Sequence, residues 1–170
     1  MKITIVQLGK IPEEVLTAIA SELREKFELS TETTRPIEIP KEIYNEIRHQ
    51  YPAPLVLKFL SEKFQNKTLG VTDKDLYAEN LNFVFGQAYY HGNYGVVSIH
   101  RLDPTFYRQK PDKNLLIERA VKEAIHEVGH MLGLGHCSIS TCVMSFSNTI
   151  GDVDRKNKEL CQSCRKKVWV

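Results

Sequence analysis

Three histidines and a glutamate within HEVGHMLGLGHC, at 126–137, have the types and spacing of a metal site. His126 and His130 are four residues apart, so on a helix their imidazoles stand on one face and can reach a single ion. Zinc binds histidine nitrogen at about 2.0–2.1 Å and favours a tetrahedron, in which two helical histidines fill two corners. The third ligand must come from outside the helix, and His136 is the candidate. We therefore predict a zinc site formed by His126, His130 and His136.

Gly133 has to reverse the chain between the second and third histidines, because a straight helix cannot bring residue 136 back to the ion. Helices commonly end at a residue in the left-handed conformation, which glycine adopts without a side-chain clash. We predict a positive φ at Gly133, after which the chain doubles back under the ion and presents His136.

Glu127 can supply the acid–base chemistry of such a site. Three histidines leave one corner of the zinc for water, whose pKa falls to about 7 on the metal. Glu127 is placed to accept the proton of that water and to pass it to a leaving amine. HExxH alone occurs by chance in about one such chain in a hundred, and the further glycine and histidine lower this to the order of 10⁻⁵. The residues therefore indicate amide hydrolysis rather than an amphipathic helix with surface histidines.

All four cysteines of the chain lie near its C-terminus and predict a second metal site: Cys137, Cys142, Cys161 and Cys164. Their two gaps fit the knuckles of a zinc site with four thiolates, which leaves no open position on the ion. Two disulfides, or a redox-active pair formed by the last two cysteines, are the alternatives; a redox pair belongs to a thioredoxin-like βαβ context, which is absent. We expect a structural zinc, which would fix the backbone next to His136.

The histidine motif HEVGHMLGLGH resembles the signature of the metzincin metallopeptidases. In that clan a later methionine forms a tight turn under the zinc site, and Met144, in CVMSF, fits this role. Some metzincins place a tyrosine that can touch the metal two residues after the methionine, where this chain has Phe146. The motif, the cysteine directly after it, Met144 and the terminal CxxC together resemble the archaemetzincins. The resemblance covers nearly the whole chain, including GVTDKDLYAENLNFVFGQA at 70–88.

This resemblance implies an α/β (α+β) fold: a compact metzincin-like domain with a twisted, mostly parallel sheet, an antiparallel edge strand, a catalytic helix and a C-terminal helix. It also implies two zinc ions per chain, one catalytic and one structural. We expect one catalytic domain over 1–170. Its upper part, about 1–133, carries the active-site helix, and its lower part, about 134–170, carries the Met-turn and the cysteines.

Hydrophobic periodicity independently predicts alternating strands and helices. Asp112 is the predicted N-cap of the helix that carries the histidines. Residues 41–50 are either a polar helix or an inserted loop. The expected strands are 2–8, 35–40, 69–73, 82–90 and 94–102; the expected helices are 12–28, 54–64, 112–132 and a last helix from about 154 that carries Cys161 and Cys164.

The sequence HGN at 91–93 predicts a turn, so the two flanking strands should form a hairpin. A metzincin edge strand usually binds an extended peptide by strand addition. We assign this edge to 94–102, with Val97 and Ser98 near the cleft; a solvated edge strand is the alternative. On the zinc-binding helix, Glu123 lies one turn before Glu127 and is expected to pair with Arg119, four residues earlier; a supporting position beside the zinc site is the alternative.

Composition excludes several classes of protein. The chain has 170 residues, 42% hydrophobic and 26% charged, with a net charge of +2, which argues against a nucleic-acid binder. It has no apolar run long enough for a membrane span, and MKITIVQLGK lacks the features of a signal peptide. We expect a cytoplasmic monomer whose partner is a peptide substrate, and aminopeptidase action on short peptides is the expected mode. The alternative is a zinc protein that binds peptides or protein partners with little turnover.

Overall fold

The computed structural model describes residues 1–168 and is built around a five-stranded sheet. In chain order the strands of this sheet are β1 (Lys2–Leu8), β2 (Ser30–Thr33), β4 (Thr68–Thr72), β6 (Gly86–Ala88) and β7 (Tyr94–Ser98). They lie in the spatial order β2-β1-β4-β7-β6, and all neighbours are parallel except β6 and β7. This confirms the predicted mostly parallel sheet with an antiparallel edge strand.

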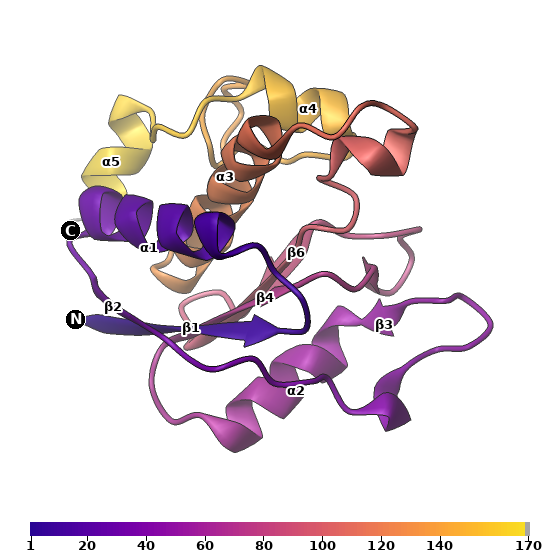
Figure 1. Cartoon of the computed structure of the whole chain (residues 1–170). Coiled ribbons are helices and arrows are strands. Elements are labelled where there is room, and N and C mark those ends of the chain that lie inside the picture. The colour runs from indigo at the N-terminus through magenta and orange to yellow at the C-terminus, as the bar shows by residue number, and fades with distance from the viewer. Residues whose placement is uncertain (169–170) are drawn as a thin grey trace.

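Helices cover both faces of the sheet. They are α1 (Glu13–Phe27), α2 (Ala53–Lys63), α3 (Lys113–Met131), α4 (Ile150–Arg155) and α5 (Gln162–Val168). Helices α1 and α3 lie over one face and α2 over the other, while α4 and α5 lie on the side of α1 and α3 (Figure 1). A second, two-stranded parallel sheet pairs β3 (Tyr51–Pro52) with β5 (Leu76–Tyr77). Within residues 1–168 no helix is both long and apolar enough to span a membrane.

Strand β1 shows why both faces are covered. Successive strand residues point to opposite faces. Ile3 and Ile5 accordingly enter the core formed with α1 and α3, whereas Val6 and Leu8 enter the core formed with α2. All four side chains are fully buried, which stabilises the fold by about 1.5–3 kcal/mol each.

Helix α3 carries the first two histidines to the edge of the sheet. As predicted, Asp112 caps the helix, because its side chain accepts the N–H of Leu115 at 3.0 Å. The helix packs against α1, β6 and β7, and every residue from 120 to 129 is buried. Polar groups in such surroundings cost free energy unless a partner satisfies them, so the polar residues of this stretch mark a site.

The prediction that 94–102 forms the edge of the sheet is wrong, because β7 lies between β4 and β6. Every β7 residue after Tyr94 is buried, so this strand needs neighbours on both sides. Strand β6 is short and only half-buried, which suits an edge. The hairpin itself is confirmed, since β6 and β7 pair antiparallel across the turn at 91–93.

Residues 35–40 form no regular strand, contrary to the prediction. Ile37 makes only an isolated bridge with Leu8, because Pro36 and Pro40 on either side cannot donate ladder hydrogen bonds. Of the undecided segment 41–50, only Lys41–Ile43 is helical, as one short 3₁₀ turn.

The predicted last helix is in fact two helices, α4 and α5. Lys156 ends α4 in an extended conformation with ψ 155°, and Cys161 lies in the connection that follows. Only Cys164 belongs to α5. The break has a physical reason: a continuous helix would hold Cys161 on the helix surface, whereas the connection lets its sulfur turn toward the other three cysteines.

Candidate active site

Three imidazoles converge at the C-terminal end of α3. Their ring centroids are 4.6–5.3 Å apart, and one nitrogen each from His126, His130 and His136 lies within 4.8 Å of the others. The first two histidines come from successive turns of α3, and His136 returns from the segment after the helix. The structure thus brings together the three residues whose spacing predicts a metal site.

Two backbone carbonyls determine which ring nitrogens face this centre. His126 Nδ1–H donates to Val143 O at 2.8 Å, and His130 Nδ1–H donates to Leu134 O at 2.7 Å. Both Nε2 atoms therefore carry lone pairs, and these two atoms face each other at 3.0 Å. Two lone pairs repel at this distance unless a cation lies between them. Because zinc–nitrogen bonds of about 2.0–2.1 Å place two corners of a tetrahedron roughly 3.4 Å apart, the donor set fits zinc.

Burial, which is only partial at the exposed His136, favours the neutral form of these histidines, which is the form that binds a metal. It lowers the pKa of His126 well below its usual range. Burial also lowers the pKa of His130 and of His136, and in all three cases the positive charge of Lys156 acts in the same direction.

Gly133 has φ 98°, which confirms the predicted left-handed turn. Its N–H donates to His130 O at 3.0 Å, and the N–H of Leu134 donates to Gly129 O at 2.9 Å, so the helix ends in a closed turn. The imidazole of His91, at the tip of the β6–β7 hairpin, packs directly against Gly133 and leaves no room for a Cβ. This contact is a second reason for glycine, and the sequence pattern did not predict it.

Met144 is fully buried against the helix that carries the histidines. A Cβ at Gly129 would lie 2.5 Å from its sulfur, so the methionine fills the space that this glycine leaves. Met144 O accepts the N–H of Cys137 at 2.9 Å, which ties the turn to the residue after His136. The ring of Phe146 lies 5.2 Å from the ring of His136, measured between centroids, and offers no ligand atom.

Glu127 is one of two buried carboxylates in the site. It is 4% exposed, and its Oε2 has no hydrogen-bond partner among the described residues. Burial raises the pKa of Glu127 well above its usual range; the charge of Glu123 adds to the shift and that of Lys156 opposes it. A carboxylate held in this way takes up a proton more readily than an exposed one, which suits a general base.

Glu123 does not pair with Arg119, contrary to the prediction. Its Oε1 lies 2.9 Å from Lys156 Nζ, and Arg119 instead donates two hydrogen bonds of 2.8 Å to the carboxylate of Asp154. Both partners come from the end of α4, which crosses α3 at this point. On a buried helix, a side chain of the covering segment is the nearer and better oriented partner, whereas the i,i+4 rule describes exposed helix surfaces.

A cleft of about 220 Å³ opens beside the histidines. Strand β6, the residues before it and residues 146–148 form its walls, and Glu123, Glu127 and the histidines also line it. Among the described residues that line the cleft there is no lysine or arginine. The apolar side chains of its lining are Ala78, Leu81, Phe83, Val84, Phe85, Ala88 and Phe146.

Val97 and Ser98, predicted near the cleft, do not line it. They are 0% and 3% exposed in the interior strand β7. The residue that the prediction missed is Gly86, which pairs with Val97 from the edge strand. A Cβ at Gly86 would lie 2.6 Å from Val96 O and 2.9 Å from the side chain of Glu127, so glycine lets β6 come close to that carboxylate. A glycine inside a strand pattern is the signal that could have revealed it.

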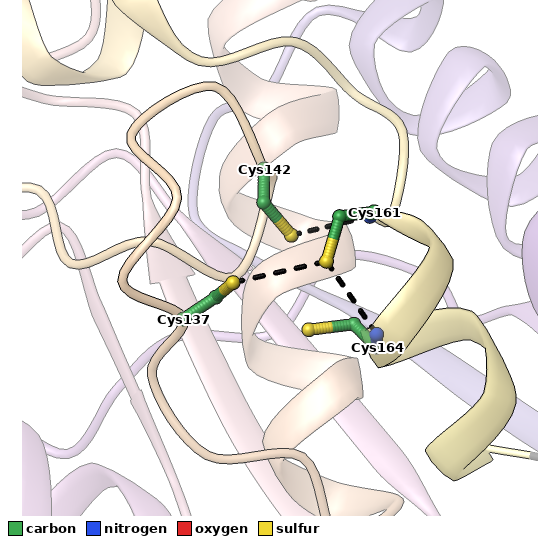
Figure 2. Close-up of side chains that lie close together, drawn as sticks. All are labelled: Cys137, Cys142, Cys161 and Cys164. Carbon is green, nitrogen blue, oxygen red and sulfur yellow. Dashed lines mark hydrogen bonds between the residues drawn. The ribbon is translucent and has the colours of Figure 1, made fainter.

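The four cysteines also converge. Cys137 and Cys142, on the loop after α3, point toward Cys161, just before α5, and Cys164, in its first turn (Figure 2). All four are free thiols whose sulfurs lie within 4.8 Å of one another, and Sγ of Cys137 is 3.8 Å from Sγ of Cys161. Zinc–sulfur bonds of about 2.3 Å place the corners of a tetrahedron roughly 3.8 Å apart. The arrangement fits one metal ion better than two disulfides.

Backbone N–H groups surround these sulfurs. Cys142 Sγ accepts the N–H of Met144 and of Cys161 at 3.4 Å each, and Cys161 Sγ accepts the N–H of Cys164 at 3.5 Å. This last bond is the main cause that lowers the pKa of Cys161 to about 7, whereas burial raises the pKa of Cys142 and of Cys164. Four such thiols become thiolates together only around a cation, so the cluster could hold a metal.

Comparison with known proteins gives relatives over nearly the full length. The family model described as Peptidase family M54 matches residues 10–169. The chain is 45% identical to the archaemetzincin of Methanocaldococcus jannaschii over 168 residues, which covers 99% of this chain and 93% of that protein. It is 40% identical to the archaemetzincin of Pyrococcus furiosus, with 98% and 91% covered.

Solved structures share the architecture. The crystal structure of archaemetzincin from Methanopyrus kandleri matches with a TM-score of 0.89 at 37% identity, covering 99% of this chain and 93% of that one. Archaemetzincin from Archaeoglobus fulgidus, complexed with malonate, matches with a TM-score of 0.87 at 40% identity, covering 98% and 99%. With these relatives and with the histidine and cysteine clusters described above, the chain belongs to peptidase family M54, the archaemetzincins, and is a zinc metallopeptidase.

Proposed function

We propose that this chain hydrolyses peptide bonds in short peptides, with a zinc ion held by His126, His130 and His136 and with Glu127 as general base. One observation carries the proposal: two Nε2 lone pairs face each other at 3.0 Å, and the same cleft is lined by a buried carboxylate whose Oε2 has no hydrogen-bond partner among the described residues. Metal-assisted hydrolysis needs these two components, a Lewis acid site and a base beside it.

When bound, zinc supplies a Lewis acid that polarises the substrate carbonyl and acidifies a water molecule. Glu127 accepts a proton from that water and then donates it to the leaving amine. The raised pKa of Glu127 favours its holding the proton between the two transfers. The carbonyls of Val143 and Leu134 hold the rings of His126 and His130 in one orientation throughout.

Strand β6 is the proposed platform for the peptide. As the edge of the sheet it can add a strand on its outer side, and all three of its residues line the cleft. The side-chain oxygen of Gln87 has no hydrogen-bond partner among the described residues and can accept a peptide N–H. The apolar walls favour substrates with uncharged side chains next to the cleaved bond.

The finer mode of action that we propose is removal of residues from the amino end of the peptide. The small cleft supports it, because about 220 Å³ lies below the roughly 300–1,000 Å³ of common ligand pockets. An aminopeptidase must also hold the substrate's amino group. Of the two carboxylates that line the cleft, Glu127 is the base and Glu123 is already paired with Lys156. Backbone carbonyls of β6 are therefore the proposed acceptors for this amino group.

We further propose a second zinc ion, held by Cys137, Cys142, Cys161 and Cys164. Four thiolates complete a tetrahedron and leave no position for water or substrate, so its role is structural. Free thiolate ligands persist in a reducing compartment, which supports the cytoplasm as the place of action. The net charge of +2 supports a role without nucleic acid, and we propose that the protein acts as a monomer.

The test is mass spectrometry of a diverse peptide pool after incubation with zinc-loaded protein, beside Glu127→Gln as control. Half of the pool carries acetylated amino termini. Cleavage that is lost in the variant supports the peptidase, and cleavage restricted to free amino termini supports the aminopeptidase mode. Equal cleavage of acetylated peptides would overturn that mode alone. Identical products from both proteins would overturn the role of Glu127.

Gly86→Ala is expected to lower kcat/KM for peptide cleavage by about 10- to 100-fold, because the added Cβ pushes β6 away from Glu127 or displaces that carboxylate. The matched control is Gly151→Ala in α4, where the added Cβ meets only Thr149 Oγ1 at an ordinary 3.6 Å. Steady-state kinetics of the two variants make the comparison. Equal rates in both would show that the close approach of β6 to Glu127 does not limit catalysis.

A further inference from the structure

Lys156, in the connection after α4, has a side chain that is 0% exposed. Its Nζ lies 2.9 Å from Glu123 Oε1 and donates to Ser145 O at 3.2 Å. Three segments far apart in the sequence thus meet at one ammonium group: the middle of α3, the turn after Met144 and the end of α4. Glu123 lines the cleft and Lys156 does not, so the ammonium lies behind the cleft lining.

Stability alone is a poor explanation for this buried ion pair. The free-energy cost of taking two charges out of water offsets much of their mutual attraction. Replacing such a pair with apolar side chains often leaves the protein equally stable or more stable. A better explanation for a buried ion pair is that it holds segments of the chain in one specific arrangement. The contacts of Lys156 identify two features that it can hold.

The first is the turn that orients His126. Ser145 follows Val143 by two residues, and Val143 O accepts the Nδ1–H of His126 at 2.8 Å. Between them, Met144 packs against α3. A shift of this turn would move the acceptor that sets the tautomer and rotation of the histidine. Changes at such outer partners of metal-binding histidines typically alter metal affinity or activity by about 10- to 100-fold.

The second is Glu123, which lies one helical turn before Glu127 and also lines the cleft. Without a counter-ion, this carboxylate would place a second negative charge beside Glu127. It would also offer the metal and the substrate's amino group a competing oxygen ligand. Lys156, which does not line the cleft, supplies that counter-ion at 2.9 Å, although Glu123 Oε1, like Glu127 Oε2, has no hydrogen-bond partner among the described residues.

We propose that Lys156 is a positioning residue for the peptidase reaction. It holds Ser145 so that His126 keeps its orientation, and it neutralises Glu123, so that Glu127 is the cleft carboxylate without a counter-ion among the described residues. This inference rests on the proposed function, because it assigns the pair a purpose in the same site.

The test compares Lys156→Met with a matched control, Lys122→Met. Lys122 is a second buried lysine, 5% exposed, whose Nζ donates to Val153 O at 3.1 Å and which does not line the cleft. Each substitution removes a buried ammonium and keeps a long, unbranched side chain. Three quantities are measured for both variants. They are the unfolding temperature, the zinc affinity of the histidine site by chelator competition, and kcat and KM on a peptide that the unmodified protein cleaves.

Lys156→Met is expected to lower kcat and histidine-site zinc affinity by about 10- to 100-fold each, with KM changed by less than about threefold. Lys122→Met is expected to lower the unfolding temperature to a similar extent, with kcat and zinc affinity within about threefold of the unmodified protein. Equal losses of kcat in the two variants would show that Lys156 has only a structural role and would overturn the proposal. Unchanged kcat in folded Lys156→Met would overturn it too.

The double variant Glu123→Gln with Lys156→Met separates charge from packing. Its kcat should be about tenfold higher than that of Lys156→Met alone, because no unpaired carboxylate remains at the cleft. An equal kcat in the two variants would overturn the role assigned to Glu123. If Lys156→Met does not fold, the double variant replaces it, and a histidine-site zinc affinity within about threefold of that of the unmodified protein is the overturning result. If the unmodified protein cleaves no peptide, the proposed function fails, whereas the zinc affinities still test how Lys156 positions His126.

Discussion

Glu127→Gln is expected to lower kcat for peptide hydrolysis by about 10²- to 10⁴-fold, the range that a general acid–base residue contributes. Glutamine keeps the shape of the side chain and cannot accept the proton of the attacking water. None of the three histidines changes, so zinc affinity at that site is expected to stay within about threefold. Single-turnover cleavage of one defined peptide, with metal content measured on the same sample, makes the comparison.

This variant should also fold at least as stably as the unmodified protein. Glu127 is 4% exposed, and Oε2 has no partner among the described residues. Replacing a buried, poorly satisfied carboxylate with a neutral amide removes a desolvation cost. Higher or equal stability with lost activity is the pattern of a group retained for function. The control is Glu118→Gln, an exposed glutamate of the same helix, for which both quantities should be unchanged. Activity within tenfold of normal in Glu127→Gln would contradict its role as base.

Cys161→Ser is expected to have the largest effect on stability, on the order of several kcal/mol, because metal binding to such a cluster is part of the folding free energy. After α3, the apolar residues that are buried in the core outside the turn at Met144 and the cysteines are Leu134, Val153 and Leu160, and none of them belongs to the loop at 137–142 or to α5. The four sulfurs are therefore a main tie between this loop and α5. Thermal unfolding with and without added zinc, and zinc content per chain, measure the effect.

The same substitution should weaken zinc binding at the histidines by about 10- to 100-fold, although Cys161 is no part of that group. Cys137 directly follows His136, and its N–H donates to Met144 O at 2.9 Å. Loss of the ion at the sulfurs therefore loosens the backbone that presents His136. Ser138→Ala, an exposed position of the same loop, is the control. Unchanged histidine-site affinity in folded Cys161→Ser would contradict the coupling of the two sites.

Local spacing was sufficient to predict the groups that the structure brings together. The separation of His126 and His130 by four residues places both on one face of any α-helix, because that periodicity belongs to the backbone. The turn at Gly133 follows equally from local geometry, since its φ of 98° favours a residue without a Cβ. Cysteine knuckles and the hairpin turn at 91–93 are local signals of the same kind.

Only the tertiary structure decided which strand is the edge and which charges pair. Val97 and Ser98 lie in β7, between β4 and β6. This strand is interior because helices and neighbouring strands pack against its buried residues. Arg119 could reach Glu123 along the helix, yet each binds a partner from the end of α4. These outcomes depend on packing between segments distant in the chain, where burial and orientation outweigh sequence proximity.

The sequence alone was therefore enough to identify the residues that carry the chemistry. The contacts that hold those residues in place were determined by the fold. HExxHxxGxxH specifies its own geometry through the helix period and one glycine. Val143 O on His126, the approach of Gly86 to Glu127 and the burial of Lys156 have no such local rule. They arise when distant segments of the chain pack around the site, and such contacts depend on all the packed segments at once.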